Sequence, residues 1–280
     1  MAISGATFAA DDAGVRPAEE IEHKGGTGAW VDRASSTVDM EGTEATYWKQ
    51  SELVVLPRFI PMGLINDLIS EVRLAFHARV RRSVRGYKHS ESIGATSLRE
   101  LAPGVDALYR SPQFIEFLER LTDAKLQPCP AWDAHASAVY HYAEPGDACG
   151  AHYDTSWYRG VRYTVLIGLV NDSTSRLVCE PHKREPHRPQ RRLEVATEPG
   201  TMVVFNGDKL WHWVSPLGEG EARTVLTLQY VTNPTMGLAG VVITLLKDAL
   251  AYFGWREVAR TLRQAFRRPG AAGVSERPSS

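Results

Sequence analysis

The chain has 280 residues, a formal net charge of −1, 43% hydrophobic residues and 23% charged residues. These are ordinary values for a globular protein, so the composition excludes a fibrous or wholly disordered chain. A net charge this close to zero argues against a dedicated nucleic-acid-binding protein.

The chain has three cysteines, at positions 129, 149 and 179, without a C-x-x-C spacing. They indicate neither a disulfide framework nor a zinc knuckle, and they favour a reducing, cytoplasmic location. The first twenty residues lack a basic segment followed by an apolar run, so no secretory signal is expected. The apolar run at 236–246 ends at Lys247 and is too short to span a membrane.

Residues 1–45 are rich in Gly, Ala, Ser and acidic residues and show no sustained periodicity, which predicts a disordered N-terminal arm. One domain is expected over residues 46–235, with a helical half at 60–123 and a β core at 125–232. The segment ELVVLPRFIP predicts a strand followed by a turn.

A helix is expected after Pro61, because its apolar residues recur every three or four positions. The basic and polar stretch at 81–92 contains Gly86 and is interpreted as a loop. A helix is expected at 97–109, with an interruption at Pro103. A further helix should follow, with Ser111 as its N-cap.

From residue 125 onward, short apolar runs alternate with turn residues. Strands are predicted at 135–142, 150–154, 161–170, 175–180, 193–197, 201–206, 211–215 and 223–231. Eight short strands after a helical half predict an α+β, mainly β fold with a jelly-roll or cupin-like core and helices packed on one sheet.

The Pro-rich basic segment at 181–192 is interpreted as a hairpin loop, either simply solvated or an electropositive rim for anionic substrates. Residues 236–270 predict a C-terminal helical extension with one broad apolar face. That face is expected to pack on its own domain or in a homodimer, in preference to a membrane surface.

The clearest chemical pattern is His152-x-Asp154, two potential metal ligands that point to the same face of an extended strand. His212 follows downstream and can supply a third ligand. Two histidines and one carboxylate that leave coordination positions open are the facial triad of non-haem Fe(II) oxygenases.

Residues 135–232 resemble the double-stranded β-helix core of the Fe(II)/2-oxoglutarate-dependent oxygenases, in the style of the prolyl-hydroxylase branch. The matching features are Tyr142 and Gly146, Gly150 to Asp154, an apolar strand ending at Asn171, Pro199 to Phe205, His212 and Arg223. Their order and approximate spacing agree over the whole core.

The resemblance implies that His152, Asp154 and His212 bind Fe(II). It further implies that 2-oxoglutarate chelates the iron and that its distal carboxylate pairs with Arg223, a residue suited to forked carboxylate binding. Tyr142 matches a position whose phenol often contacts the same carboxylate. Thr227 lies four residues after Arg223 and predicts a hydroxyl close to the iron.

Three differences from the family pattern narrow the reactions and substrates that the resemblance implies. Asp154 stands where related halogenases carry Gly or Ala, which favours hydroxylation, desaturation or a related oxidation over halogenation. Gln229 replaces a second arginine of the nucleic-acid demethylases, which disfavours a nucleic-acid substrate. Residues 173–176 replace a Gly-Gly of many prolyl-hydroxylase relatives.

The loop at 155–160 follows the metal pair, and within it Trp157, Tyr158 and Arg159 are candidate substrate contacts or structural anchors. The predicted function is an oxygenase that hydroxylates a small organic substrate of amino-acid or natural-product type while 2-oxoglutarate and O2 become succinate and CO2. The alternatives are a peptidyl side-chain hydroxylase and a non-catalytic β-helix ligand-binding protein.

Overall fold

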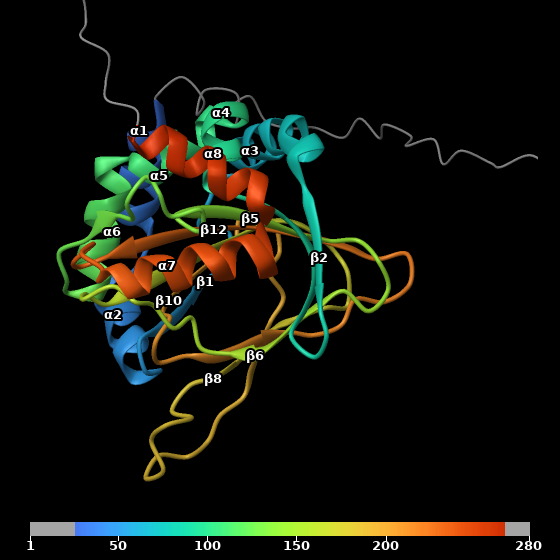
Figure 1. Cartoon of the computed structure of the whole chain (residues 1–280). Coiled ribbons are helices and arrows are strands. Elements are labelled where there is room, and N and C mark those ends of the chain that lie inside the picture. Colours follow the sequence, from blue (N-terminus) through green and yellow to red (C-terminus); the bar gives the residue numbers. More distant parts are fainter. Residues whose placement is uncertain (1–25, 267–280) are drawn as a thin grey trace, which may run out of the picture.

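The computed structural model describes residues 26–266 (Figure 1). The strands are β1 (Leu53–Leu56), β2 (Val80–Val84), β3 (Lys88–Ile93), β4 (Gln127–Pro128), β5 (Ser137–Tyr142), β6 (Ala148–His152), β7 (Arg162–Asp172), β8 (Leu177–Glu180), β9 (Leu193–Val195), β10 (Met202–Asn206), β11 (Trp211–Val214) and β12 (Ala222–Val231). The helical elements are α1 (Gly26–Thr37), α2 (Met40–Lys49), α3 (Met62–Leu74), the 3₁₀ turn η2 (Ala75–Ala78), α4 (Ala95–Leu101), α5 (Pro103–Arg110), α6 (Pro112–Thr122), α7 (Leu238–Lys247), the π-helical turn η3 (Asp248–Tyr252) and α8 (Gly254–Phe266).

The strands form one folded sheet with the order β1-β10-β7-β12-β5-β3-β6-β11-β8-β9. Strand β3 pairs with both β5 and β6 and joins a larger layer to a smaller one that faces it. All eight predicted strands are present, and the arrangement is the predicted double-stranded β-helix.

Side-chain alternation along the strands divides the apolar residues into two cores. On β7, Val165 and Ile167 face the helices, whereas Leu166 points between the two layers. On β10, Val204 and Phe205 divide in the same way. The strands are therefore apolar on both faces, and the inner face is available to build a site.

Helices α3 to α6 pack with α1 over the outer face of the larger layer. Helix α6 begins as predicted, with Pro112 in its first turn and the Ser111 hydroxyl accepting a hydrogen bond from the Phe114 amide at 3.3 Å. The loop at 181–192 joins β8 to β9 and projects from the smaller layer (Figure 1).

The prediction of a loop at 81–92 was wrong, because β2 and β3 form a hairpin there. Gly86, with φ of +75°, provides the left-handed turn that connects them. The buried face of β3 consists of polar residues, Lys88, Ser90 and Ser92, so the segment lacks the apolar alternation by which a half-buried strand is recognised.

The N-terminal expectation also differs from the structure within residues 26–45, which are mostly helical in α1 and α2. Trp30 is buried against Phe114 of α6, with ring centroids 6.1 Å apart, and Met40 is also buried. Two buried residues in so short a stretch are too few to give a recognisable helical periodicity in the sequence. Residues 1–25 of the predicted arm lie outside the described residues.

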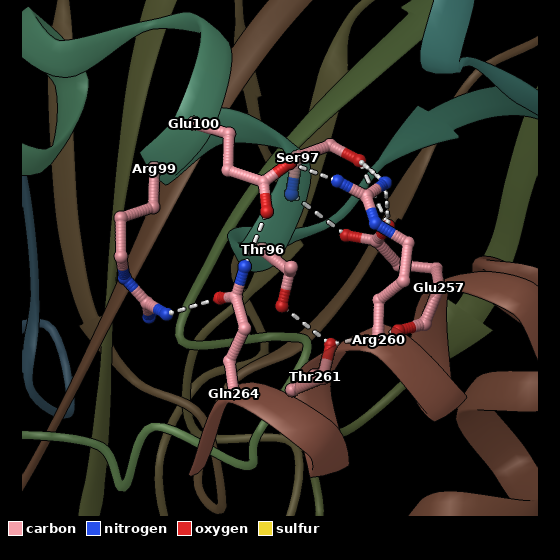
Figure 2. Close-up of polar contacts among 8 residues, drawn as sticks. All are labelled: Thr96, Ser97, Arg99, Glu100, Glu257, Arg260, Thr261 and Gln264. Atoms are coloured by element: carbon pink, nitrogen blue, oxygen red, sulfur yellow. Dashed lines mark hydrogen bonds and ion pairs between the residues drawn. The ribbon is translucent and has the colours of Figure 1, made fainter. Parts of the chain in front are cut away.

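Within the described residues, the predicted C-terminal extension forms α7, η3 and α8 and packs on its own domain, with α8 lying beside α4 (Figure 1). Residues 267–270 of the predicted extension lie outside the described residues. Figure 2 shows the polar contacts that join them: Glu257 accepts hydrogen bonds from the Ser97 amide and hydroxyl, at 2.9 and 2.8 Å, and Arg260 donates to both residues. The Thr96 and Thr261 hydroxyls hydrogen bond at 2.6 Å. Within residues 26–266, no helix combines the length and apolar character needed to cross a membrane.

Candidate metal centre and cavity

The pairing of β6 with β11 places His152 directly opposite His212, and Asp154 follows at the end of β6. The Asp154 Oδ1 atom lies 3.3 Å from His152 Nε2 and 3.8 Å from His212 Nε2. One potential ligand atom from each residue lies within 4.8 Å of the other two. The structure therefore brings the three predicted metal ligands together.

Both imidazoles are oriented by the backbone. His152 Nδ1 is 2.7 Å from the Gly150 carbonyl, and His212 Nδ1 is 3.1 Å from the Leu210 carbonyl. A carbonyl can only accept, so each Nδ1 carries a proton, and Nε2 is the ring nitrogen directed toward Asp154. A metal ligand requires this orientation, in which Nε2 is the coordinating atom.

Three neighbours fix the Asp154 carboxylate and backbone. The Thr164 hydroxyl donates to its Oδ2 at 2.8 Å, and Arg162 donates to its backbone carbonyl at 2.7 Å. A Cβ on Gly207 would lie 2.6 Å from the Asp154 Cβ, so only glycine allows this approach. Gln229 also accepts a hydrogen bond from Thr164, at 3.2 Å.

The electrostatics favour metal binding. Burial alone would raise the pKa of Asp154, but His212, His152 and Arg162 together outweigh it and hold that pKa well below its usual range. Burial lowers the pKa of His212 to about 4. Burial also opposes the charged form of His152, although its contacts with Asp154 reverse that effect and raise its pKa. Near neutral pH the set therefore offers an ionised carboxylate and a neutral His212.

The triad opens into a cavity of about 290 Å³. The lining includes a mainly apolar group, Leu166, Leu177, Phe205, Val214 and Val225, together with Thr164, Thr227 and Gln229. Arg162 lines the cavity beside the metal set, where it donates to the Asp154 backbone. The lining also includes Tyr87, Lys88, His135, Tyr140, Trp157, Lys247 and Tyr252. The cavity thus combines an apolar group of side chains with a group that is rich in cations and phenols.

Arg223 is fully buried on β12, and its Cα pairs across the sheet with that of Tyr142. Its Nε donates to the Thr197 hydroxyl at 3.1 Å, whereas Nη1 and Nη2 have no hydrogen-bond partner among the described residues. Burial lowers the pKa of Arg223, and the neighbouring Tyr142 opposes that shift. The two unpaired nitrogens of this buried guanidinium can donate hydrogen bonds to the two oxygens of a bound carboxylate.

Tyr142 and Thr227 both line the cavity, whereas Arg223 lies behind the Tyr142 ring, with Cζ 5.4 Å from its centroid. The Thr227 hydroxyl donates to the Ala138 carbonyl at 3.2 Å. Two of the residues that sequence reasoning proposed around the cosubstrate, Tyr142 and Thr227, therefore line the same cavity, and Arg223 contacts one of them.

The three candidate substrate residues separate. Trp157 is 52% exposed and lines the cavity. Tyr158 is buried in the helical core, where its hydroxyl donates to Asp133 at 2.6 Å, as expected of the structural anchor that sequence left open. Arg159 is exposed and does not line the cavity.

Sequence reasoning missed several residues that the fold brings to the site. Thr164 and Arg162 share one face of β7 with Leu166, and strand alternation could have identified them. Thr197 lies in the connection after β9, while Lys88, His135 and Lys247 come from three distant segments. No local pattern indicates their convergence.

A family model named HalD, described as Halogenase D, matches residues 39–164, a range that contains His152 and Asp154 but not His212. No curated protein matches this chain by sequence. Among solved structures, the non-heme alpha ketoglutarate dependent epimerase SnoN from nogalamycin biosynthesis is similar, with a TM-score of 0.59 and 15% identity over 85% of this chain and 90% of that one.

Two further solved structures are similar. The carbocyclase SnoK, from the same biosynthesis and also described as non-heme and alpha ketoglutarate dependent, has a TM-score of 0.58 and 13% identity over 74% of this chain and 91% of that one. A prolyl hydroxylase from Trichoplax adhaerens, solved with a hypoxia inducible factor peptide, has a TM-score of 0.51 and 15% identity over 70% of this chain and 93% of that one. At these identities the likeness establishes the fold alone, which is the double-stranded β-helix that these structures share.

Proposed function

We propose that this chain is an Fe(II)- and 2-oxoglutarate-dependent oxygenase that hydroxylates a small organic substrate while 2-oxoglutarate and O2 become succinate and CO2. The observation that carries the proposal is the pairing of a preoriented His152-Asp154-His212 set with a buried arginine, Arg223, that lacks partners for two nitrogens. A two-histidine, one-carboxylate set leaves coordination positions for a keto acid and for oxygen.

Each residue has a definable task. His152, Asp154 and His212 hold the metal, which when bound would supply the oxidising chemistry. Arg223 binds the distal carboxylate of the cosubstrate, and the apolar walls beside the triad exclude water from it. The hydroxyl of Thr164 keeps the carboxylate of Asp154 in place.

Oxygen transfer is proposed in preference to halogenation. The HalD match includes the His152-x-Asp154 segment, but here that segment supplies a carboxylate that lies within 4 Å of both imidazoles. A carboxylate there takes the coordination position that a halide would need. Desaturation and ring formation share the same site and differ from hydroxylation in how the substrate is placed.

A free small molecule is proposed as the substrate in preference to a peptide side chain. The cavity has a volume of about 290 Å³, and Trp157, Lys247 and Tyr252 from segments beyond the strand core contribute to its walls. Activity on free small molecules but not on peptides separates the two alternatives. A non-catalytic ligand-binding protein would need neither the metal set nor Arg223.

Two further predictions concern the setting of the protein. A cytoplasmic location is proposed from the three unpaired cysteines. A homodimer through the C-terminal helix is supported by the exposed apolar residues Leu238, Val242 and Leu246, which follow one another at four-residue spacing on α7.

The proposed activity is tested by Fe(II)-dependent release of succinate from 2-oxoglutarate under air. The wild-type protein should release succinate, and His212→Ala should not. His187→Ala is the matched control, because His187 is exposed in the loop between β8 and β9. Equal release from wild type and His212→Ala would remove the metal set from the reaction and refute the proposal.

A further inference from the structure

One end of the cavity is built around the ring of Tyr252. Lys88 on β3 places its Nζ 4.1 Å from the centroid of that ring, and Lys247 at the end of α7 places its Nζ 5.7 Å from it. Both lysines and Tyr252 line the cavity. Two cationic side chains from separate segments thus converge on one wall.

Lys88 is poorly satisfied by the protein. It is 1% exposed, and the described residues give its ammonium one hydrogen bond, to the Ser92 hydroxyl at 3.0 Å. The ammonium also lies over the faces of the Tyr140 and Tyr252 rings, and these faces contact the charge without accepting a conventional hydrogen bond. Burial lowers the pKa of Lys88 to about 7, so an anion bound against the ammonium would favour its charged form.

The charges lining the cavity are unbalanced. Among the described lining residues the cations are Lys88, Arg162 and Lys247, and the carboxylate is Asp154. Arg162 donates to the Asp154 backbone and belongs to the metal end. The lysine end is therefore left without a carboxylate in the cavity wall.

Asp133 and Asp248 lie behind this wall. Both are buried, and with His135 they form a cluster whose ligand atoms lie within 4.8 Å of one another. The Asp248 Oδ1 atom is 2.8 Å from His135 Nδ1, but neither Asp248 oxygen has a hydrogen-bond partner among the described residues. These two carboxylates offset the lysine charges from behind without hydrogen bonding to the Lys88 ammonium, so an anion in the cavity can supply the hydrogen bonds that Lys88 lacks.

We propose that the lysine end of the cavity binds a carboxylate of the substrate through Lys88 and Lys247. This inference rests on the proposed function and specifies the substrate class as a small carboxylic acid. Tyr87 connects the subsite to the metal end, with its ring 5.6 Å from the His152 ring and 6.4 Å from the Tyr252 ring. A molecule held at the lysines extends past Tyr87 toward the triad.

A competing interpretation is a second metal site, because Asp133, His135 and Asp248 are buried with ligand atoms within 4.8 Å of one another. The Asp133 carboxylate already accepts hydrogen bonds from the Tyr158 hydroxyl and the His135 amide. The nearby lysines also repel a cation. We therefore favour an anion, and the metal content of the protein decides between the two.

The test uses phenylacetate and its uncharged analogue phenylacetamide as probes, because each is small and aromatic. Each is titrated anaerobically into the full-length protein loaded with Fe(II) and 2-oxoglutarate, and the thermal unfolding midpoint is recorded together with the visible charge-transfer band. The variants are Lys88→Met and Lys247→Met, and the control is Lys49→Met, which lies on the exposed surface of α2.

Phenylacetate should raise the unfolding midpoint of wild type and of Lys49→Met, with no comparable shift from phenylacetamide. Its apparent affinity should fall about tenfold or more in each cavity variant, because a charged hydrogen bond is lost. The charge-transfer band should persist in every sample, which shows that the acid has not displaced 2-oxoglutarate.

Equal effects of the acid and the amide in wild type, or unchanged affinity in both cavity variants, would overturn the subsite while leaving the oxygenase proposal intact. More than one bound metal per chain, reduced by Asp248→Asn, would establish the second metal site instead. Absence of the charge-transfer band from wild type would refute the proposed function itself.

Discussion

Replacing Arg223 with methionine should change cosubstrate binding and protein stability in opposite directions. The guanidinium is fully buried, donates one hydrogen bond to Thr197, and leaves two nitrogens without partners among the described residues. Removing one member of a buried, hydrogen-bonded charge pair costs about 2–5 kcal/mol, so the affinity for 2-oxoglutarate should fall roughly 30-fold to several thousand-fold. In the absence of cosubstrate, burying the two unpaired nitrogens costs about 1–3 kcal/mol of folding free energy. Methionine removes that cost, which offsets the loss of the hydrogen bond to Thr197.

The affinity is measured by anaerobic titration of the Fe(II)-loaded protein, and the stability by urea unfolding of the metal-free protein. Arg260→Met is the matched control, because Arg260 donates to Ser97 and Glu257 in the contact between α4 and α8 (Figure 2). That variant should lose stability and keep its affinity for 2-oxoglutarate. An Arg223→Met protein that is strongly destabilised yet binds the cosubstrate normally would show that Arg223 is structural.

Three further changes test other parts of the account. Gly207→Ala places a Cβ 2.6 Å from that of Asp154 and should weaken Fe(II) binding about 10- to 100-fold by metal titration, whereas Gly237→Ala meets open space and should not. Burial lowers the pKa of Lys88 to about 7, so between pH 7 and about 10 the unfolded chain binds one more proton than the folded protein. The free energy of unfolding of wild type should therefore rise with pH, relative to that of Lys88→Met, by up to ~1.4 kcal/mol per pH unit. Parallel pH profiles of the two proteins in urea unfolding would contradict this. Leu246→Glu on the exposed face of α7 should convert a dimer to a monomer in light scattering, and an unchanged mass would exclude that interface.

The site was accessible from sequence where one strand carries several of its residues. His152 and Asp154 lie two residues apart, and Arg223 and Thr227 lie four apart, so strand alternation alone places each pair on one face. The pairing of His152 with His212 depends on the sheet register, which spacing along the chain does not determine and which the family resemblance supplied.

The remainder depended on packing between distant segments. The hairpin of β2 and β3 was not recognised, because its buried face carries Lys88, Ser90 and Ser92. Two of these residues, Lys88 and Ser92, contact Tyr252 of the distant C-terminal turn η3. Tyr158 illustrates the same limit: whether it faced substrate or core depended on Asp133, a partner 25 residues away in sequence. Local propensity contains no information of this kind.

The iron ligands are tested by anaerobic titration of the metal-free protein with Fe(II) and 2-oxoglutarate, with the visible charge-transfer absorption of a chelated keto acid as the readout. We expect the band in wild type and in His187→Ala, and we expect no band in His212→Ala. A wild-type protein that shows no band, or a His212→Ala protein that shows the wild-type band, would contradict the assignment of His152, Asp154 and His212 as the iron ligands.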